Sequence, residues 1–314
     1  MKNHSIIILF ASGLLWGCYS DAVVELPDNK PLVAINSINF QPDSTWLVEL
    51  TKSVSFYYSS GNLYISNANV KIVDEQGSIT QLSPITLENR TVYKSDQRPL
   101  KNKLYTIKVE APGFPTTSAT SKIPEPVQIT KIEIDSTFFI EQKQAVTQNP
   151  DHNVDFSKPM QCKIFFNDPA NEANYYDVRL YIEGETQYTN DSGETVTKTN
   201  FIEYPLVDPA TYQAVSLLTN DTKFNGLQYG LQINIPFYLF FTPVGNLHIV
   251  LTSLSSDRYK YMQSVKLQNT NKHDPFAQPV IIHNNIENGL GIFAGFSKSV
   301  WVLQKPAEET VSVN

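Results

Sequence analysis

The sequence predicts a mostly β protein, with an immunoglobulin-like β-sandwich followed by a larger strand-rich domain that contains one helix. Short segments of alternating apolar and polar residues recur along the chain, and turn-forming residues bound them. The composition agrees, because 16 Tyr and 17 Phe stand against only 13 Gly, and aromatic side chains together with Val, Ile and Thr favour strands. With 314 residues, the chain is long enough for two domains.

The first residues, 1–17, are predicted to be a signal peptide. Lys2 precedes a mostly apolar run at 6–15, which suits a secretory signal and is too short for a bilayer, where about twenty helical residues are needed. The run leads into Leu-Trp-Gly-Cys at 15–18, with a small residue directly before the cysteine. This pattern is typical of a lipobox, so we expect Cys18 to be lipidated and to become the mature N-terminus. The alternative is an ordinary signal peptide or an uncleaved anchor.

Cysteine usage favours the lipobox. The chain has two cysteines, Cys18 and Cys162, whereas a secreted protein with disulfides would carry an even set in its mature region. Cys162 is expected to be a small buried hydrophobe in a strand. Two or three acyl chains on Cys18 would attach the protein firmly, because each buried methylene contributes roughly 0.8 kcal/mol. No later segment is apolar enough to span a membrane, so the lipid is the only membrane contact that we expect.

Residues 18–30 are expected to be a polar tether and residues 31–125 the immunoglobulin-like sandwich. A turn signal lies at 74–77, and the Pro-containing segment 123–126 reads as an extended linker. The predicted strands of the sandwich are at 32–40, 46–50, 68–73 and 104–109.

The second domain is predicted at residues 126–304, followed by a polar tail at 305–314. One helix is expected at 256–268, capped by Ser255 or Ser256 with Asp257 in its first turn. A hairpin tip is expected at 190–193, and the strand at 247–251 is expected to pair with the one at 231–241. The other predicted strands of this domain are at 129–134, 160–166, 176–182 and 300–303.

Residues 283–297 carry a more specific pattern, His-Asn-Asn-Ile-Glu-Asn-Gly-Leu-Gly-Ile-Phe-Ala-Gly-Phe-Ser, which resembles the closing signature of the DUF4249 family. These residues are expected to be structural, with the glycines allowing positive φ or close packing, and a ligand loop is the alternative. The signature residues in question are Asn285, Asn288, Gly289, Gly291, Phe293 and Gly295. Further segments that resemble the family, in order, are 31–34, 69–74, 168–169, 174–181, 220–226 and 258–261.

The resemblance implies an outer-membrane lipoprotein of the Bacteroidota with an N-terminal domain like those that regulate carboxypeptidases. Such proteins often occur beside TonB-dependent receptors, so a receptor of this kind is the expected partner. The resemblance supplies no catalytic residue. Surface exposure is favoured over the periplasm, although only Asp21 follows Cys18 where a surface-export signal would have several acidic residues.

The charge and the candidate catalytic residues argue against most other classes. Loss of the signal takes the formal net charge from −7 to about −8 because Lys2 is removed, and nucleic-acid binding would need a basic surface. No metal site or cofactor is expected, because no histidines have metal-ligand spacing and no glycine-rich phosphate loop occurs. Residues 295–299 approach a Gly-x-Ser-x-Gly motif without its last glycine and are expected to form a turn. The carboxylates of Asp168, Glu172 and Asp177 could form a glycosidase pair, but 168–171 reads as a turn.

The best binding candidates are Phe56, Tyr57 and Tyr58, which precede Ser-Ser-Gly-Asn. Exposed rings there could stack on a sugar or contact the rim of a barrel; the alternative is packing at a strand end. We therefore expect a non-enzymatic outer-membrane lipoprotein that assists a TonB-dependent transporter in nutrient uptake. The alternatives are an enzyme acting on polysaccharide or peptide through an unrecognised site, and an adhesin or envelope scaffold.

Overall fold

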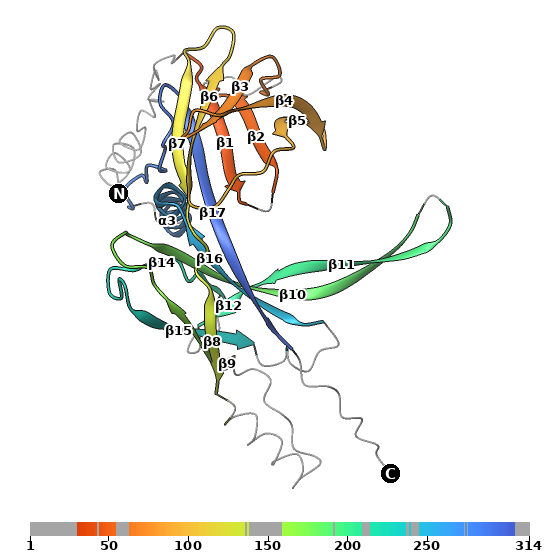
Figure 1. Cartoon of the computed structure of the whole chain (residues 1–314), viewed down its shortest axis with the longest axis vertical. Helices are drawn as coiled ribbons and strands as arrows, with labels where there is room; N and C mark the ends of the chain where they lie inside the picture. Colours follow the sequence, from red (N-terminus) through yellow and green to blue (C-terminus); the bar gives the residue numbers. More distant parts are fainter. Residues whose placement is uncertain are drawn as a thin grey trace, which may run out of the picture. The chain divides into compact units, whose positions relative to one another are not determined.

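The computed structural model is mostly β, with one helix among the residues that it describes, and this confirms the predicted fold class at that level (Figure 1). The described residues are 30–42, 44–54, 63–135, 137, 159–190, 192–208, 214–236, 239, 245–272, 274 and 276–304. The chain forms two compact units, of which the first, Met1–Pro31 with Val54–Ser59, lies almost wholly outside the described residues. All that follows concerns the second unit, Leu32–Ser53 with Ser60–Asn314.

The described residues of the first half of this unit form seven strands, and four of them confirm the predicted segments. Their order in the sheet is β1-β2-β5-β4-β3-β6-β7. The predicted turn at 74–77 is also confirmed, with Gly77 at φ +84° and the Asp74 carboxylate accepting hydrogen bonds from the backbone of Gln76 and Ser78. The strands are β1 (Val33–Phe40), β2 (Trp46–Lys52), β3 (Asn69–Asp74), β4 (Ile79–Leu87), β5 (Arg90–Ser95), β6 (Lys103–Glu110) and β7 (Thr117–Ile123).

In the second half, β15 (Gln228–Pro236) pairs with β9 (Pro159–Asn167), which also pairs with β8 (Ile129–Ile134). The predicted pairing of 231–241 with 247–251 is therefore wrong. β16 (Leu247–Leu254) instead lies between two other strands, and its side chains are buried on both faces. A strand that is apolar on both faces suits the middle of a sheet, and nearness in sequence does not decide its neighbours.

The neighbours of β16 are β10 (Tyr175–Thr189) and β17 (Leu290–Leu303). β17 is fourteen residues long, so the turn predicted at 295–299 is wrong. Glycine within a strand can mark a close approach as readily as a turn, and at Gly295 the Phe40 ring lies where a Cβ would be. The remaining strands are β11 (Thr195–Tyr204), β12 (Leu206–Val207), β13 (Ala214–Val215) and β14 (Thr219–Asn220).

β17 joins the two halves of the sheet. It pairs in parallel with β1 and antiparallel with β16, so the first and the last long strands of the unit are neighbours. Two hydrophobic cores result, one within 33–123 and the other within 127–251. The first core also takes Ile286 and Phe293 from the C-terminal segment, so residues 31–125 do not build it alone. The domain boundaries proposed from the sequence remain predictions.

The helix prediction is confirmed in type and start. α3 (Ser256–Asn271) has Ser255 as its N-cap, whose Oγ accepts a hydrogen bond from the Arg258 backbone N–H at 3.3 Å. Asp257 lies in the first turn, where a negative charge interacts favourably with the helix dipole. Tyr259 is the buried residue of α3, and its ring packs on Tyr175 of β10 with the centroids 4.6 Å apart.

The predicted hairpin tip at 190–193 is confirmed between β10 and β11. The pairing of β10 with β16 ends at Ile182, whereas its pairing with β11 continues to Thr189 opposite Thr195. In the described part of the chain, β10 from Gly184 onward therefore pairs only with β11, and Figure 1 shows this hairpin extending past the other strands.

Candidate functional site

A hollow of about 440 Å³ lies on the face of β10, β16 and β17 next to the start of α3. Its volume is within the range of about 300 to 1,000 Å³ that is usual for small-molecule sites. The walls combine apolar and aromatic side chains with several charged ones. The lining residues are Gln41, Asp177, Arg179, Tyr181, Phe201, His248, Val250, Thr252, Arg258, Phe296, Lys298 and Val300.

Arg179, on β10, is bound by two carboxylates. Its Nε donates to Asp177 Oδ2 at 2.7 Å, and its Nη1 donates to both oxygens of Glu203 at 2.9 Å. Burial alone would lower the pKa of Arg179, but the hydrogen bond and charge of Asp177 outweigh this effect and raise it. The charge of this guanidinium is therefore already compensated within the protein.

His248, on β16, belongs to a second polar cluster at the edge of the hollow. Its Nε2 lies 2.7 Å from Glu183 Oε1, and its ring meets Phe201 edge-on with the centroids 5.0 Å apart. The hydrogen bond with His248 is the largest cause of the lowered pKa of Glu183, followed by the backbone N–H of Asn246. His248 is thus a largely buried histidine with partners on neighbouring strands.

Arg258, in the first turn of α3, differs from Arg179 because it has no carboxylate partner among the described residues. Its guanidinium carbon lies 4.2 Å from the centroid of the Phe296 ring, a cation–π contact. Nε and Nη1 are buried without a hydrogen-bond partner in the described part of the chain, and so is Oε1 of Gln41. Burial, and then the charge of Arg179, lowers the pKa of Arg258 to about 10. The surroundings of Arg258 therefore disfavour the positive charge of its guanidinium.

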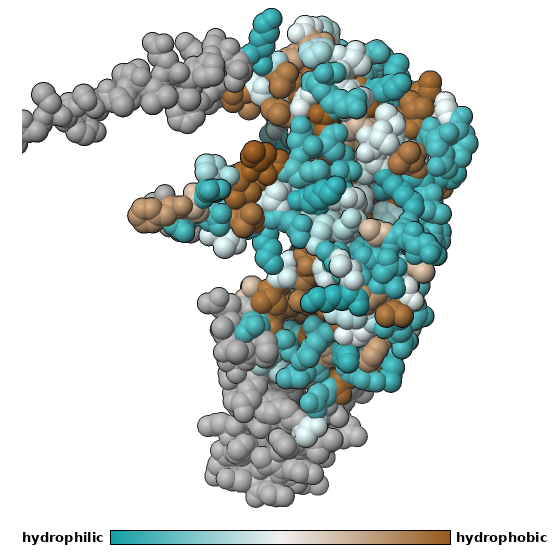
Figure 2. Space-filling model, turned by 90° about the vertical axis from the view of Figure 1, so that its left-hand side faces the viewer, coloured by the Kyte–Doolittle hydropathy of each residue, from teal (hydrophilic) through white to brown (hydrophobic). Residues whose placement is uncertain are grey.

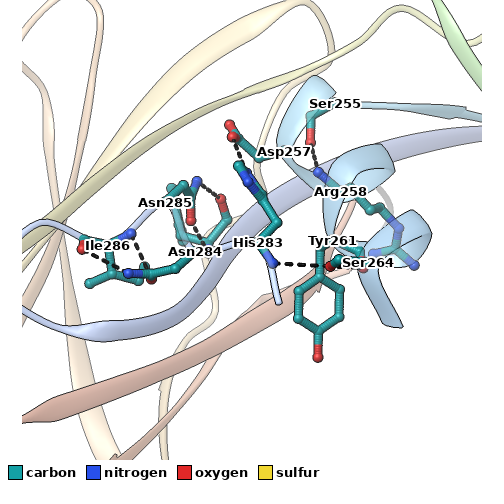
Figure 3. Close-up of polar contacts among 10 residues, drawn as sticks. Ser255, Asp257, Arg258, Tyr261, Ser264, His283, Asn284, Asn285 and Ile286 are labelled. Carbon is teal, nitrogen blue, oxygen red and sulfur yellow. Dashed lines mark hydrogen bonds and ion pairs between the residues drawn. The ribbon is translucent and has the colours of Figure 1, made fainter. Parts of the chain in front are cut away.

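The family signature begins beside the same helix (Figure 3). His283 Nε2 lies 2.9 Å from Asp257 Oδ1, and the His283 backbone N–H donates to Ser264 Oγ at 3.0 Å. Since Ser264 contacts the backbone of His283 and not its ring, these residues do not form a nucleophilic triad. Asn285 closes a loop onto β17, because its side chain accepts from the Phe293 N–H and donates to the Phe293 carbonyl.

The signature glycines lie where a side chain would not fit. Gly291 has φ +105°, and a Cβ there would overlap the carbonyl oxygen of Ile35 on the parallel neighbour β1. At Gly289 a Cβ would lie 2.7 Å from the Val33 carbonyl oxygen, and at Gly295 it would overlap the Phe40 ring.

The other signature residues also have contacts within the protein. Asn288 adopts φ +55° and donates a hydrogen bond to the Thr116 carbonyl. Phe293 is buried in the first core, with its ring stacked on Phe40 at a centroid distance of 4.6 Å. Each of these signature residues thus contacts another part of the protein, and the structural role expected for the signature remains a prediction.

The three candidate carboxylates do not converge. Asp168 accepts hydrogen bonds from the Tyr176 hydroxyl and the Gly226 N–H, whereas Asp177 binds Arg179 and Glu172 binds Lys122. Burial raises the pKa of Asp168. The turn expected at 168–171 is present, with Asn171 at φ +69°.

Some of the residues predicted to be functional lie outside the described residues, namely Cys18 and the aromatic loop Phe56, Tyr57 and Tyr58.

Cys162 is buried as predicted, and burial raises the pKa of its thiol to about 12. In the described ranges, no three His, Cys, Asp or Glu side chains are placed to hold a metal ion. No helix in the described part is long and apolar enough to cross a membrane.

The sequence did not single out the cations of the hollow. Arg179, Arg258 and Lys298 come from three elements that are far apart in the chain. One usable signal was present, since Asp177 and Arg179 are two charged residues in a strand whose opposite face buries Val178 and Leu180. A charged residue at such a position usually has a partner or a ligand.

These features define a mostly β protein with a small mixed apolar and cationic hollow, and comparison with known families identifies it further. The chain belongs to the DUF4249 family, described as a domain of unknown function, which matches residues 20–300. No curated protein is significantly similar to it.

Solved structures resemble the chain only weakly. A DUF4785 family protein from Legionella pneumophila is 9% identical with a TM-score of 0.25, and the alignment covers 71% of this chain and 52% of that one. The chain thus spans about half the length of the Legionella protein. A two-domain fibronectin type III segment of chicken tenascin is 8% identical with a TM-score of 0.20, covering 88% of this chain and 99% of that one.

Proposed function

We propose that this protein is a lipid-anchored accessory protein of the outer membrane of a member of the Bacteroidota. In this proposal it binds a TonB-dependent transporter, assists nutrient uptake and catalyses no reaction itself. The observation that carries the proposal is the β10–β11 hairpin, whose outer part buries almost no side chain within the protein.

The outer part of the hairpin suits contact with a partner. An isolated two-stranded hairpin is at best marginally stable in water, so a strand pair of this length gains from an additional surface. Tyr188 in this outer part is half exposed, and so are Phe201 and Ile202 at its base. In the described part, β11 pairs only with β10, which leaves its other edge open to strand addition.

Lipid attachment would make even a weak contact effective. The sequence supports Cys18 as the attachment point, followed by the polar tether at 18–30. Confinement at the membrane raises the effective concentration of a partner in the same membrane, without any additional contact.

We also propose that residues 31–125 form an immunoglobulin-like sandwich of the carboxypeptidase-regulatory type. Two features support it. β4 pairs with β3 through its first residues and with β5 through its last ones, as a strand that passes between two sheets does. Trp46 of β2 packs edge-on against Tyr105 of β6, with ring centroids 5.0 Å apart, inside one core.

The competing enzyme proposal predicts two carboxylates that are free to act on a substrate. At the hollow, Asp177 and Glu203 are both bound to Arg179, so their charges are already engaged with this guanidinium. An adhesin would instead present a broad apolar patch. On the face shown in Figure 2, hydrophobic residues form separate patches among hydrophilic ones.

The proposal is tested by purifying the full chain from its own outer membrane in mild detergent, through a C-terminal tag. We expect a TonB-dependent barrel to co-purify. A matched variant in which residues 185–199 are replaced by an Asn-Gly turn should lose the barrel while it stays in the membrane fraction. Recovery of no barrel with the unmodified protein would contradict the proposal, and equal recovery with the variant would contradict the role of the hairpin.

Anchoring has its own test. The Cys18→Ser variant should leave the membrane fraction because it cannot receive the lipid. If this variant is processed normally and still sediments with the membranes, Cys18 is not the anchor.

A further inference from the structure

Beyond partner binding, the structure assigns a ligand site to the hollow at the start of α3: we propose that it binds a small organic carboxylate with an apolar ring or chain. In this arrangement the carboxylate lies against Arg258 and Lys298, and the apolar part lies against Phe201, Val250 and Val300.

The charge of the hollow favours an anion. Among the lining residues, Arg179, Arg258 and Lys298 are cationic and Asp177 is the carboxylate. Arg179 is compensated by Asp177 and Glu203, whereas no ion pair is found for Arg258 or Lys298 among the described residues. Two uncompensated cations thus share one hollow in a chain whose formal net charge is −7.

The hydrogen bonding of Arg258 favours an acceptor. Its Nε and Nη1 carry N–H groups that are buried without a partner among the described residues. A buried donor that lacks a partner costs about 1–3 kcal/mol, and more when the group is charged. Guanidinium groups bind carboxylates with strong, charge-assisted hydrogen bonds. A ligand carboxylate would therefore relieve a cost that the protein carries without it.

The position of Arg258 is fixed before a ligand arrives. Arg258 lies in the first turn of a capped helix, and its guanidinium is stacked on Phe296 of β17. A side chain held in this way loses little conformational freedom on binding. The same wall carries Gln41, whose buried Oε1 also lacks a partner in the described part and could accept a hydrogen bond from a polar group of the ligand.

Binding can be measured with benzoate as the probe and the full mature chain in mild detergent, by ligand-observed NMR titration. We expect saturable binding of benzoate. Its neutral analogue benzamide, and acetate, which lacks the ring, should each bind at least about tenfold more weakly, because each loses one of the two contacts. Equal affinity for benzoate and benzamide, or no saturation by benzoate, would overturn the proposal.

Substitutions locate the site. Arg258→Gln should weaken benzoate binding at least about tenfold, and Lys298→Gln about threefold, because each removes one uncompensated charge. Arg98→Gln is the matched control, since Arg98 is exposed and does not line the hollow. Unchanged affinity in Arg258→Gln overturns the assignment. If that variant does not fold, Lys298→Gln decides, and an affinity equal to that of the control then overturns it.

Discussion

At the scale of single residues, the glycines of the family signature lie against β1, the parallel neighbour of β17. Gly291 shows this most clearly, because it combines positive φ with a backbone carbonyl where a Cβ would lie. The sequence predicted that glycines in this segment serve positive φ or close packing. It could not show which strand approaches them, because that strand lies far away in the chain.

Gly291→Ala should destabilise the protein by more than about 3 kcal/mol. A residue with a side chain at this φ is strained by about 1–3 kcal/mol, and the overlap with the Ile35 carbonyl adds to the strain. Urea denaturation of the two proteins measures the difference.

Gly77→Ala is the matched control, because Gly77 has φ +84° and no atom lies within 4 Å of the position that its Cβ would take. It should cost only the conformational strain, about 1–2 kcal/mol. Equal losses in the two variants would show that the close contact with β1 has no energetic effect.

Asp168 should make the protein less stable as the pH rises. Its folded-state pKa is raised above the usual value of 3.8, mainly by burial, so folding favours the protonated form. The stability that this group contributes is present below about pH 3.8 and is lost as the pH rises through the raised folded value. Asp168→Asn cannot ionise and does not show this loss.

The measurement is the free energy of unfolding of the two proteins at several pH values from about 3.5 to 7. The advantage of the unmodified protein over Asp168→Asn should shrink as the pH rises. An advantage that grows over this range would mean that the pKa of Asp168 is lowered in the folded state.

At the scale of elements, prediction succeeded where one face of a strand is buried. A strand was predicted at 104–109, and Tyr105, Ile107 and Val109 on one of its faces are all buried in the first core. Prediction failed for the pairing of β15 and β16 because both segments are apolar and lie close in sequence, while pairing depends on partners from β9, β10 and β17.

Replacing residues 185–199 by an Asn-Gly turn should change the free energy of unfolding by less than about 1 kcal/mol. The removed part of the hairpin has no fully buried side chain among its described residues, so little apolar surface returns to water. Asn-Gly supplies the turn that a two-residue hairpin loop needs. Urea denaturation of the isolated protein is the test, and a large loss would mean that the outer hairpin stabilises the fold and is not reserved for a partner.

At the scale of the whole molecule, composition and alternation predicted the fold class, but they did not predict the order of the strands in the large sheet. Alternation reports which residues face a core, and it contains no information on which strand lies beside which. The pairing of β1 with β17 and the separate three-stranded sheet of β8, β9 and β15 therefore could not be predicted. The hollow depends on the same pairings, and this is why its cations were missed.

A fragment of residues 31–125 should not fold by itself, because its core is completed by Ile286 and Phe293. Phe293 is fully buried and stacks on Phe40, so its absence would leave a large cavity in the fragment. Amide proton dispersion in NMR spectra of the fragment, compared with the full chain, measures this. A well-dispersed spectrum with cooperative unfolding would instead support an autonomous domain.

Ala34 of β1 pairs with Leu290 of β17, so the large sheet can be completed only late in the synthesis of the chain. Residues this far apart meet late, because the intervening chain must first be made and brought together. Until β17 has left the ribosome, the edge of β1 that pairs with it has no partner. A chain that completes its sheet so late would stay unfolded while it is made, which would suit the export that we propose, because a translocation channel accepts unfolded polypeptides.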